Sequence, residues 1–292
     1  MGIIEIDGLT KDYGGKGIFD VSFSIDRGEA FGFLGPNGAG KTTTIRHLMG
    51  FIRPQSGTCS IDGMNCMAQA AAIQRTLGYI PGESAFIEEM TGAALIRFMA
   101  AYRGMKDLTR AKELTKRFEL DTSGKIKRMS KGMKQKMAIV CAFMHDPSVL
   151  ILDEPTSGLD PLMQNRFIEL ILSEKARGKT ILMSSHMFEE VERTCDRVGM
   201  IRQGRLFSVS SVRALKESKR RLYVVTLEDE SEAADFAREE LTVISRERER
   251  VTVAVQQDMQ SFVRAMSLHH VVALDVVTQS LEDIFMQYYG SD

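Results

Sequence analysis

Residues 30–42 read AFGFLGPNGAGKT, and this stretch decides the fold class. Its first part, Ala30 to Leu34, is a short and continuous apolar run, which is typical of a strand buried on both faces. A glycine-rich loop follows from Gly35 to Gly40, and Lys41 to Met49 has the pattern of a helix that ends before Gly50. A strand, a loop and a helix in this order predict an α/β protein.

The loop and the first helical residues match the phosphate-loop pattern GxxxxGK followed by Ser or Thr. The glycines allow successive backbone N–H groups to converge on phosphate oxygens, and the helix N-terminus adds a favourable partial charge. We expect Lys41 to reach the terminal phosphates and Thr42 to ligate Mg²⁺. An ordinary glycine turn is the alternative. The predicted nucleotide-binding residues of this stretch are Gly35, Pro36, Asn37, Gly38, Ala39, Gly40, Lys41, Thr42 and Thr43.

A second apolar run, Val149 to Leu152, ends in the two carboxylates Asp153 and Glu154. A nucleoside triphosphatase with a phosphate loop needs an acidic residue at the end of such a strand, to hold the metal and its water shell. We therefore predict Asp153 as a metal-side carboxylate and Glu154 as the group that orients or deprotonates the attacking water. Taken alone, the pair could equally cap a helix N-terminus.

The composition is that of a folded chain of about two domains, because 292 residues are 43% hydrophobic and 26% charged. Its 38 Lys and Arg against 39 Asp and Glu give a net charge of -1, so no global positive field attracts nucleic acid or anionic lipid. No apolar run approaches the ~18 to 20 residues that cross a bilayer. The first residues also lack the basic start and apolar stretch of a signal peptide, so we expect a cytosolic chain.

Further motifs give the chain a resemblance to the ATP-binding cassette (ABC) proteins. Met129 to Gln135 resembles the signature sequence of that family, and Ser157 to Asp160 resembles its dimer-contact loop. Ser184 to His186 follows the next strand, where the family has its switch histidine, and Tyr13 is similar to the aromatic residue that stacks on adenine. The resemblance covers residues 1 to about 210 and implies an ATPase that uses ATP and Mg²⁺.

The resemblance also implies that one chain does not complete the site. In the family two cassettes pair head to tail, so Ser130 and Gly132 of one copy would close on the ATP held by the other. His186 would touch the γ-phosphate and help to hold Glu154 and the water in place. Considered without the other motifs, a histidine after two serines at a strand end is often a cap or a turn residue.

Two positions depart from the family pattern. Many members have a glutamine after a Tyr-apolar-Pro triplet, where it senses the metal, but here Gly82 and Glu83 follow the triplet. Either Glu83 or a water molecule would have to replace that glutamine. The signature has Lys131 where the first glycine usually stands and Met133 in place of glutamine, so we expect function to survive with altered turnover.

The predicted fold is a phosphate-loop cassette over residues 1–210, with a mixed-sheet core and a helical subdomain at about 85–145, followed by an accessory α/β domain over 211–292. The accessory domain has the order β-α-β-β-α-β-α, which suggests a ferredoxin-like unit. Its predicted strands are Arg221–Leu227, Leu241–Ser245, Val251–Val255 and Val271–Val277, and its predicted helices are Glu232–Glu240, Asp258–Ser267 and Leu281–Tyr288.

A single cassette without a membrane span suggests the ATPase subunit of a transporter whose permease is a separate polypeptide. We expect it at the cytoplasmic face of the membrane, paired with a second copy of itself or a related cassette, and we expect no nucleic-acid partner. Similarity to bacterial subunits for drug, antibiotic-resistance and sodium export favours an exporter. The alternative is a soluble ABC ATPase acting on a ribosome or nucleic acid, with the tail as a binding module. Lys216, Lys219, Arg220 and Arg221 form a basic cluster there, and a cluster of this kind is most often a solvated linker.

The remaining histidines and the cysteines predict no further chemistry. His47 and His145 are easily satisfied by local hydrogen bonds, and His269 and His270 would need metal-binding partners that the sequence does not reveal. The four cysteines have no metal-ligand spacing, and we expect them to be reduced.

Overall fold

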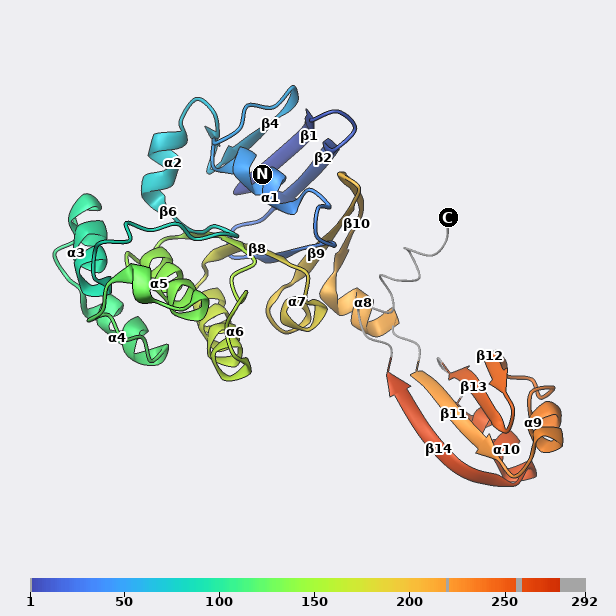
Figure 1. Cartoon of the computed structure of the whole chain (residues 1–292). Helices are drawn as coiled ribbons and strands as arrows, with labels where there is room; N and C mark the ends of the chain where they lie inside the picture. The colour runs from blue at the N-terminus through green and yellow to red at the C-terminus, as the bar shows by residue number, and fades with distance from the viewer. Residues whose placement is uncertain (1, 219–220, 256–258, 279–292) are drawn as a thin grey trace. The chain divides into compact units, whose positions relative to one another are not determined.

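A computed structural model describes residues 2–218, 221–255 and 259–278 of the chain. The chain divides into two compact units, residues 1–212 and 213–292, and each is described by itself (Figure 1). None of the helices in the described ranges is long and apolar enough to span a membrane.

The first unit contains an antiparallel sheet with the strand order β2-β1-β4-β5. Residues of β1 and β2 alternate between buried and more exposed positions, as expected for a sheet with one face on the core. Its strands are β1 (Ile4–Asp12), β2 (Gly17–Ile25), β4 (Ser56–Ile61) and β5 (Met64–Asn65).

A six-stranded mixed sheet forms the centre of this unit, in the order β10-β9-β3-β8-β7-β6. Five neighbouring strands are parallel, and only β10 is antiparallel to its neighbour. The strands are β3 (Ala30–Leu34), β6 (Leu77–Ile80), β7 (Val149–Asp153), β8 (Thr180–Ser185), β9 (Arg197–Arg202) and β10 (Arg205–Ser211). Both β3 and β7 are buried over their whole length, which explains their uninterrupted apolar sequences.

The register of the parallel strands brings the predicted motifs to one edge of the sheet. Leu34, the last residue of β3, pairs with Ser185 on β8, and Asp153 on β7 pairs with Ser184. The carboxyl ends of three strands therefore meet, and ligands of open α/β sheets bind at such edges.

Helix α1 (Lys41–Leu48) lies between the two sheets (Figure 1). Its Ile45 and Leu48 belong to one core cluster with Ile6 of β1 and Ile151 of β7. The cluster fixes the helix, and with it the loop before it, against both sheets. Other helices of this unit are α2 (Ala70–Thr76), α6 (Pro161–Ala176) and α7 (Phe188–Thr194). Helix α8 (Val212–Ser218) begins at the boundary between the two units. The predicted α/β cassette with a mixed-sheet core is confirmed.

The segment between β6 and β7 is mainly helical. It contains α3 (Gly92–Tyr102), α4 (Thr109–Arg117), the 3₁₀ turn η1 (Ile126–Arg128) and α5 (Lys131–Phe143). Ser130 caps α5 because its side chain accepts a hydrogen bond from the N–H of Met133 at 3.2 Å. Thr91 caps α3 in the same way.

The second unit has a four-stranded antiparallel sheet in the order β12-β13-β11-β14, which is the strand order of a ferredoxin-like unit. Its own core includes Phe236 from α9 and Phe262 from α10. The elements are β11 (Arg221–Leu227), α9 (Glu230–Phe236), β12 (Thr242–Glu247), β13 (Arg250–Val255), α10 (Met259–Leu268) and β14 (Val271–Thr278).

The helix predicted at 232–240 is wrong at both ends, because α9 spans Glu230–Phe236. The side chain of Asp229 accepts a hydrogen bond from the N–H of Glu232, and this cap sets the earlier start. We did not predict α7, α8 or β10. The closing helix predicted at 281–288 lies outside the described residues.

Candidate functional site

The loop between β3 and α1 has the backbone conformation that its glycines allow. Gly38 and Gly40 have φ values of +79° and +111°, in the left-handed region that favours glycine. A Cβ atom on Gly40 would also lie 2.7 Å from the side chain of Ile18. Any other residue at position 40 would therefore strain the loop and disturb its packing on β2.

Lys41 is buried and tied to its own loop. Its Nζ donates hydrogen bonds to the carbonyl oxygens of Gly35, at 2.6 Å, and Pro36, at 3.2 Å. The same atom lies 3.4 Å from Oε1 of Glu154, and only 5% of the lysine side chain is exposed. The ammonium group is thus held in the loop, at the point where the carboxyl ends of β3 and β7 meet.

Asp153 is fully buried at the end of β7. Its Oδ1 accepts a hydrogen bond from the hydroxyl of Ser184, whereas its Oδ2 is buried without a hydrogen-bond partner. A Cβ atom on Gly82 would lie 3.0 Å from that Oδ2 and 3.9 Å from Oγ1 of Thr42. An unpartnered carboxylate oxygen and a threonine hydroxyl therefore face the same space, beside Gly82, and oxygen ligands of this kind suit Mg²⁺.

Glu154 lies between a lysine and a histidine. Its Oε1 is the atom close to Lys41, and its Oε2 lies 3.1 Å from Nδ1 of His186. The Glu154 backbone has a φ of +47°, and its N–H donates to Ser184. This conformation turns the chain out of the strand immediately after Asp153, so the two neighbouring carboxylates have different surroundings: one is buried and the other is partly exposed.

The predicted signature residues lie at the start of α5. A Cβ atom on Gly132 would lie 2.8 Å from the carbonyl oxygen of Gly158, so the predicted dimer-contact loop packs directly on this helix. The stem of Lys131 also covers Gly158, since a Cβ there would lie 3.1 Å from Cγ of the lysine. Lys131, one of the departures from the family pattern, therefore has a packing role.

Tyr13 lies at the turn between β1 and β2, and 56% of the residue is exposed. The Nζ of Lys11 lies 5.7 Å from the centre of its ring. An exposed ring beside a cation is free to stack on a planar ligand. The backbone of Thr43 makes a contact within α1: its carbonyl oxygen forms a hydrogen bond at 2.7 Å with Nδ1 of the buried His47.

Comparison with known proteins agrees with this geometry. Residues 18–157 match the family model described as ABC transporter. The "ABC transporter ATP-binding protein NatA" of Bacillus subtilis (strain 168) is 37% identical over 70% of this chain and 86% of its own length. The chain belongs to the ATP-binding proteins of ABC transporters.

Other similar proteins include the "Nod factor export ATP-binding protein I" of Burkholderia orbicola (strain AU 1054), 35% identical over 84% of this chain and 82% of that protein. A solved "ATP binding subunit of ABC transporter" is 35% identical with a TM-score of 0.68 and covers 73% of this chain and 92% of its own. The predicted family is confirmed, and one of these similar proteins is named for export. The protein is an ABC ATPase whose ATP hydrolysis is coupled to transport.

The sequence did not reveal the role of Glu190 in this ABC ATPase. The residue lies on α7, is buried, and its Oε2 accepts a hydrogen bond from the hydroxyl of Ser185 at 2.7 Å. Burial raises the pKa of Glu190, and the hydrogen bonds from Ser185 and Thr156 lower it only in part. Its contact with Ser185 supports the turn that carries His186. The sequence carried no pattern that pointed to this contact, because Ser185 ends strand β8 and Glu190 lies on the following helix.

Gly82 and Glu83 of the ABC cassette lie at the edge of an open depression. Both line it together with Glu154, Lys131 and Ser157. Of the two, Gly82 is the position that faces Asp153 and Thr42, whereas the side chain of Glu83 is exposed.

Proposed function

We propose that two copies of this cassette, or this cassette and a related one, close head to tail around ATP and thereby drive a separate transmembrane permease, in the export direction. The observation that carries the proposal is the position of Glu154 between Lys41 and His186, at the carboxyl edge of a parallel sheet. The proposed base Glu154 thus has a cation, Lys41, on one carboxylate oxygen and the proposed switch residue, His186, on the other.

The phosphate site would use the loop backbone, Lys41 and the N-terminus of α1. Thr42 and Asp153 would hold Mg²⁺, because the unpartnered Oδ2 of Asp153 and the hydroxyl of Thr42 face one space. When bound, the ion supplies positive charge to the phosphate oxygens. Tyr13 would stack on the adenine ring.

The chemistry proposed for Glu154 is general-base catalysis. Its carboxylate would take a proton from water as the water oxygen forms a bond to the γ-phosphorus and the bond to the bridging oxygen of ADP breaks. His186 would hold the carboxylate and the γ-phosphate in place. The distance of 3.1 Å between Nδ1 of His186 and Oε2 of Glu154 supports this positioning role.

The proposed dimer explains why Ser130 and Gly132 lie on a different part of the cassette from the phosphate loop. The loop follows β3 in the central sheet, whereas both signature residues belong to the helical segment, where Gly132 packs on Gly158. ATP would join two surfaces, and loss of the γ-phosphate would remove the contact that held them together.

A mixing experiment tests this arrangement. Lys41→Ala and Gly132→Asp chains are each expected to be inactive, because every dimer of one variant lacks part of both sites. Mixed dimers would contain one intact site, so a 1:1 mixture should recover roughly a quarter of the wild-type ATPase activity if the copies pair at random. A mixture as inactive as its components would contradict head-to-tail sharing. Mixing either variant with itself is the control.

The proposed permease contact is an apolar depression beside the helical segment. Its lining includes Phe86, Ile87 and Leu95, and Phe98 on α3 is about half exposed. An exposed apolar depression fits a short amphipathic helix of a membrane partner at the cytoplasmic face.

Co-purification from membranes tests this contact. We expect Phe98→Glu to abolish co-purification with a transmembrane subunit and to leave the ATPase activity of the isolated cassette unchanged. Leu172→Glu is the matched control, since it places the same charge on an exposed leucine of α6. Co-purification with ribosomes or nucleic acid in place of a membrane protein would overturn the permease assignment.

A further inference from the structure

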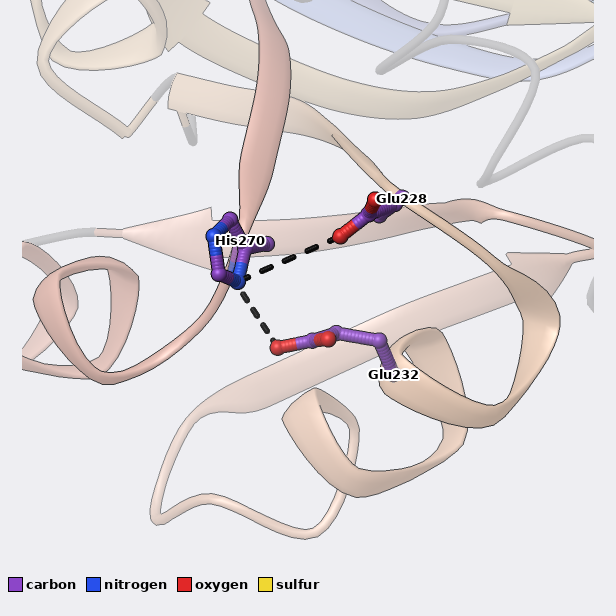
Figure 2. A group of neighbouring side chains, drawn as sticks. All are labelled: Glu228, Glu232 and His270. Carbon is purple, nitrogen blue, oxygen red and sulfur yellow. Dashed lines mark hydrogen bonds and ion pairs between the residues drawn. The ribbon is translucent and has the colours of Figure 1, made fainter.

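The second unit brings together two glutamates and a histidine, side chains of the types that can bind a metal ion, from two separate parts of the sequence. Glu228 follows β11, Glu232 lies in the first turn of α9, and His270 immediately precedes β14. One ligand atom from each lies within 4.8 Å of the other two, and within the described part of the chain this is the one cluster of three or more such residues. Figure 2 shows the carboxylates of Glu228 and Glu232 directed toward His270.

The sheet topology creates this cluster. Strands β11 and β14 are antiparallel neighbours, and Leu227 at the end of β11 pairs with Val271 at the start of β14. The residues just outside this pair, Glu228 and His270, therefore lie side by side. Asp229 then caps the start of α9, and the first turn of this helix places Glu232 next to His270.

The Glu232 carboxylate is fixed in place before any ion binds. Its Oε1 accepts a hydrogen bond from the backbone N–H of His270 at 2.9 Å and lies 3.4 Å from Nδ1 of His269. The other ring nitrogen of His269 lies 3.3 Å from Oε1 of Glu239. His269 is largely buried, with its ring edge against Phe236, so it positions Glu232 and is not itself available as a ligand.

The other two ligands are exposed and able to move. Nδ1 of His270 lies 4.0 Å from Oε2 of Glu228, and the two side chains are 84% and 66% exposed. Donor atoms bound to one Zn²⁺ ion at about 2.0–2.2 Å are roughly 3.5 Å apart, so a small rotation of either side chain would bring the three into range. Solvent would complete the coordination sphere.

We propose that Glu228, Glu232 and His270 form a binding site for a divalent transition-metal ion such as Zn²⁺. One imidazole and two carboxylates are a ligand set that transition metals accept, and the imidazole discriminates against Mg²⁺ and Ca²⁺, which prefer oxygen. The site uses no residue of the nucleotide site, and Glu232 supplies its pre-oriented ligand.

Titration of the full-length protein with Zn²⁺ by calorimetry tests the site, in excess Mg²⁺ and without nucleotide. Excess Mg²⁺ occupies the oxygen-only sites, Asp153 among them. We expect one Zn²⁺ per chain to bind, with at least tenfold weaker affinity in His270→Ala and in Glu232→Gln. Co²⁺ titration should give a visible absorption band that both variants lose. Far-ultraviolet circular dichroism shows whether the variants are folded.

Glu230→Gln is the matched control, because it removes the same charge from the same turn of α9 without removing a proposed ligand. Its Zn²⁺ affinity should stay within about twofold of the wild type, since a distant charge contributes little in water. Equal binding by the wild type and His270→Ala would overturn the proposal. An equal loss in Glu230→Gln would also overturn it, since binding would then reflect only the general negative charge.

Discussion

The Nζ atom of Lys41 lies 3.4 Å from Oε1 of Glu154, so the phosphate-loop lysine and the proposed general base form an ion pair. The lysine is almost fully buried, and a buried cation requires a compensating charge. The γ-phosphate can take over that role when ATP binds, which would release Glu154 toward a water molecule. ATP binding and the freeing of the base are thereby linked.

Glu154→Gln should separate ATP binding from hydrolysis. Glutamine keeps the shape of the side chain but cannot accept a proton, so we expect ATPase activity to fall about 10²- to 10⁴-fold. ATP affinity should be unchanged or higher, because Lys41 loses a competing negative charge. Steady-state hydrolysis and equilibrium binding of ATP measure the two effects. Hydrolysis within twofold of the wild type would contradict the role of Glu154.

Lys41→Ala should weaken ATP binding itself. The variant loses a charge-assisted contact with the phosphates, which contributes about 1.5–3 kcal/mol, so we expect a decrease in affinity of roughly 10- to 100-fold. Lys112→Ala, on the exposed face of α4, is the control for the loss of one positive charge. Equal ATP affinity of the two variants would exclude Lys41 as a phosphate ligand.

The sequence predicted those parts of the fold that depend on local pattern. The strand Ala30–Leu34 has the predicted bounds, because it is an unbroken apolar run. Strand β10 was missed because most of its residues are polar and none is fully buried, and α7 because it has only 7 residues.

The site could be predicted only where its residues lie in contiguous motifs. The phosphate loop and the Asp153–Glu154 pair are of this kind. In contrast, Ser184 on β8 donates a hydrogen bond to Asp153 on the neighbouring strand β7. Similarly, Glu228 lies beside His270 only because β11 and β14 pair. The sequence contains these residues but does not show which of them are neighbours, since strand pairing is set by tertiary packing.

The position of the missing glutamine predicts how the protein responds to Mg²⁺. Gly82 faces Asp153 and Thr42, whereas Glu83 is exposed, so we expect water to replace the glutamine. Glu83→Ala should leave the Mg²⁺ concentration for half-maximal ATPase activity within about twofold of the wild type, since an exposed charge contributes little. Gly82→Gln should shift it, because its side chain enters the space beside Asp153. A large shift in Glu83→Ala would show that Glu83 replaces the glutamine.

His145 should make the protein sensitive to mild acid. Its Nε2 contacts the carbonyl oxygen of Leu77 at 3.1 Å, and its Nδ1 is buried without a hydrogen-bond partner. Burial, aided by the charge of Arg103, lowers the pKa of His145 from 6.5 to about 4. The unfolded state therefore binds a proton more readily than the folded state, and the stability present above pH 6.5 is lost as the pH falls toward 4.

His145→Gln should reduce this acid sensitivity, because glutamine can still donate a hydrogen bond to Leu77 but does not take up a proton. Urea unfolding at several pH values between 4 and 7 measures the effect as the slope of the unfolding free energy against pH. His270→Gln, measured with a chelator present, is the control, since that side chain is exposed and should leave the slope unchanged. An equal slope in the wild type and His145→Gln would show that His145 is not the source of the acid sensitivity.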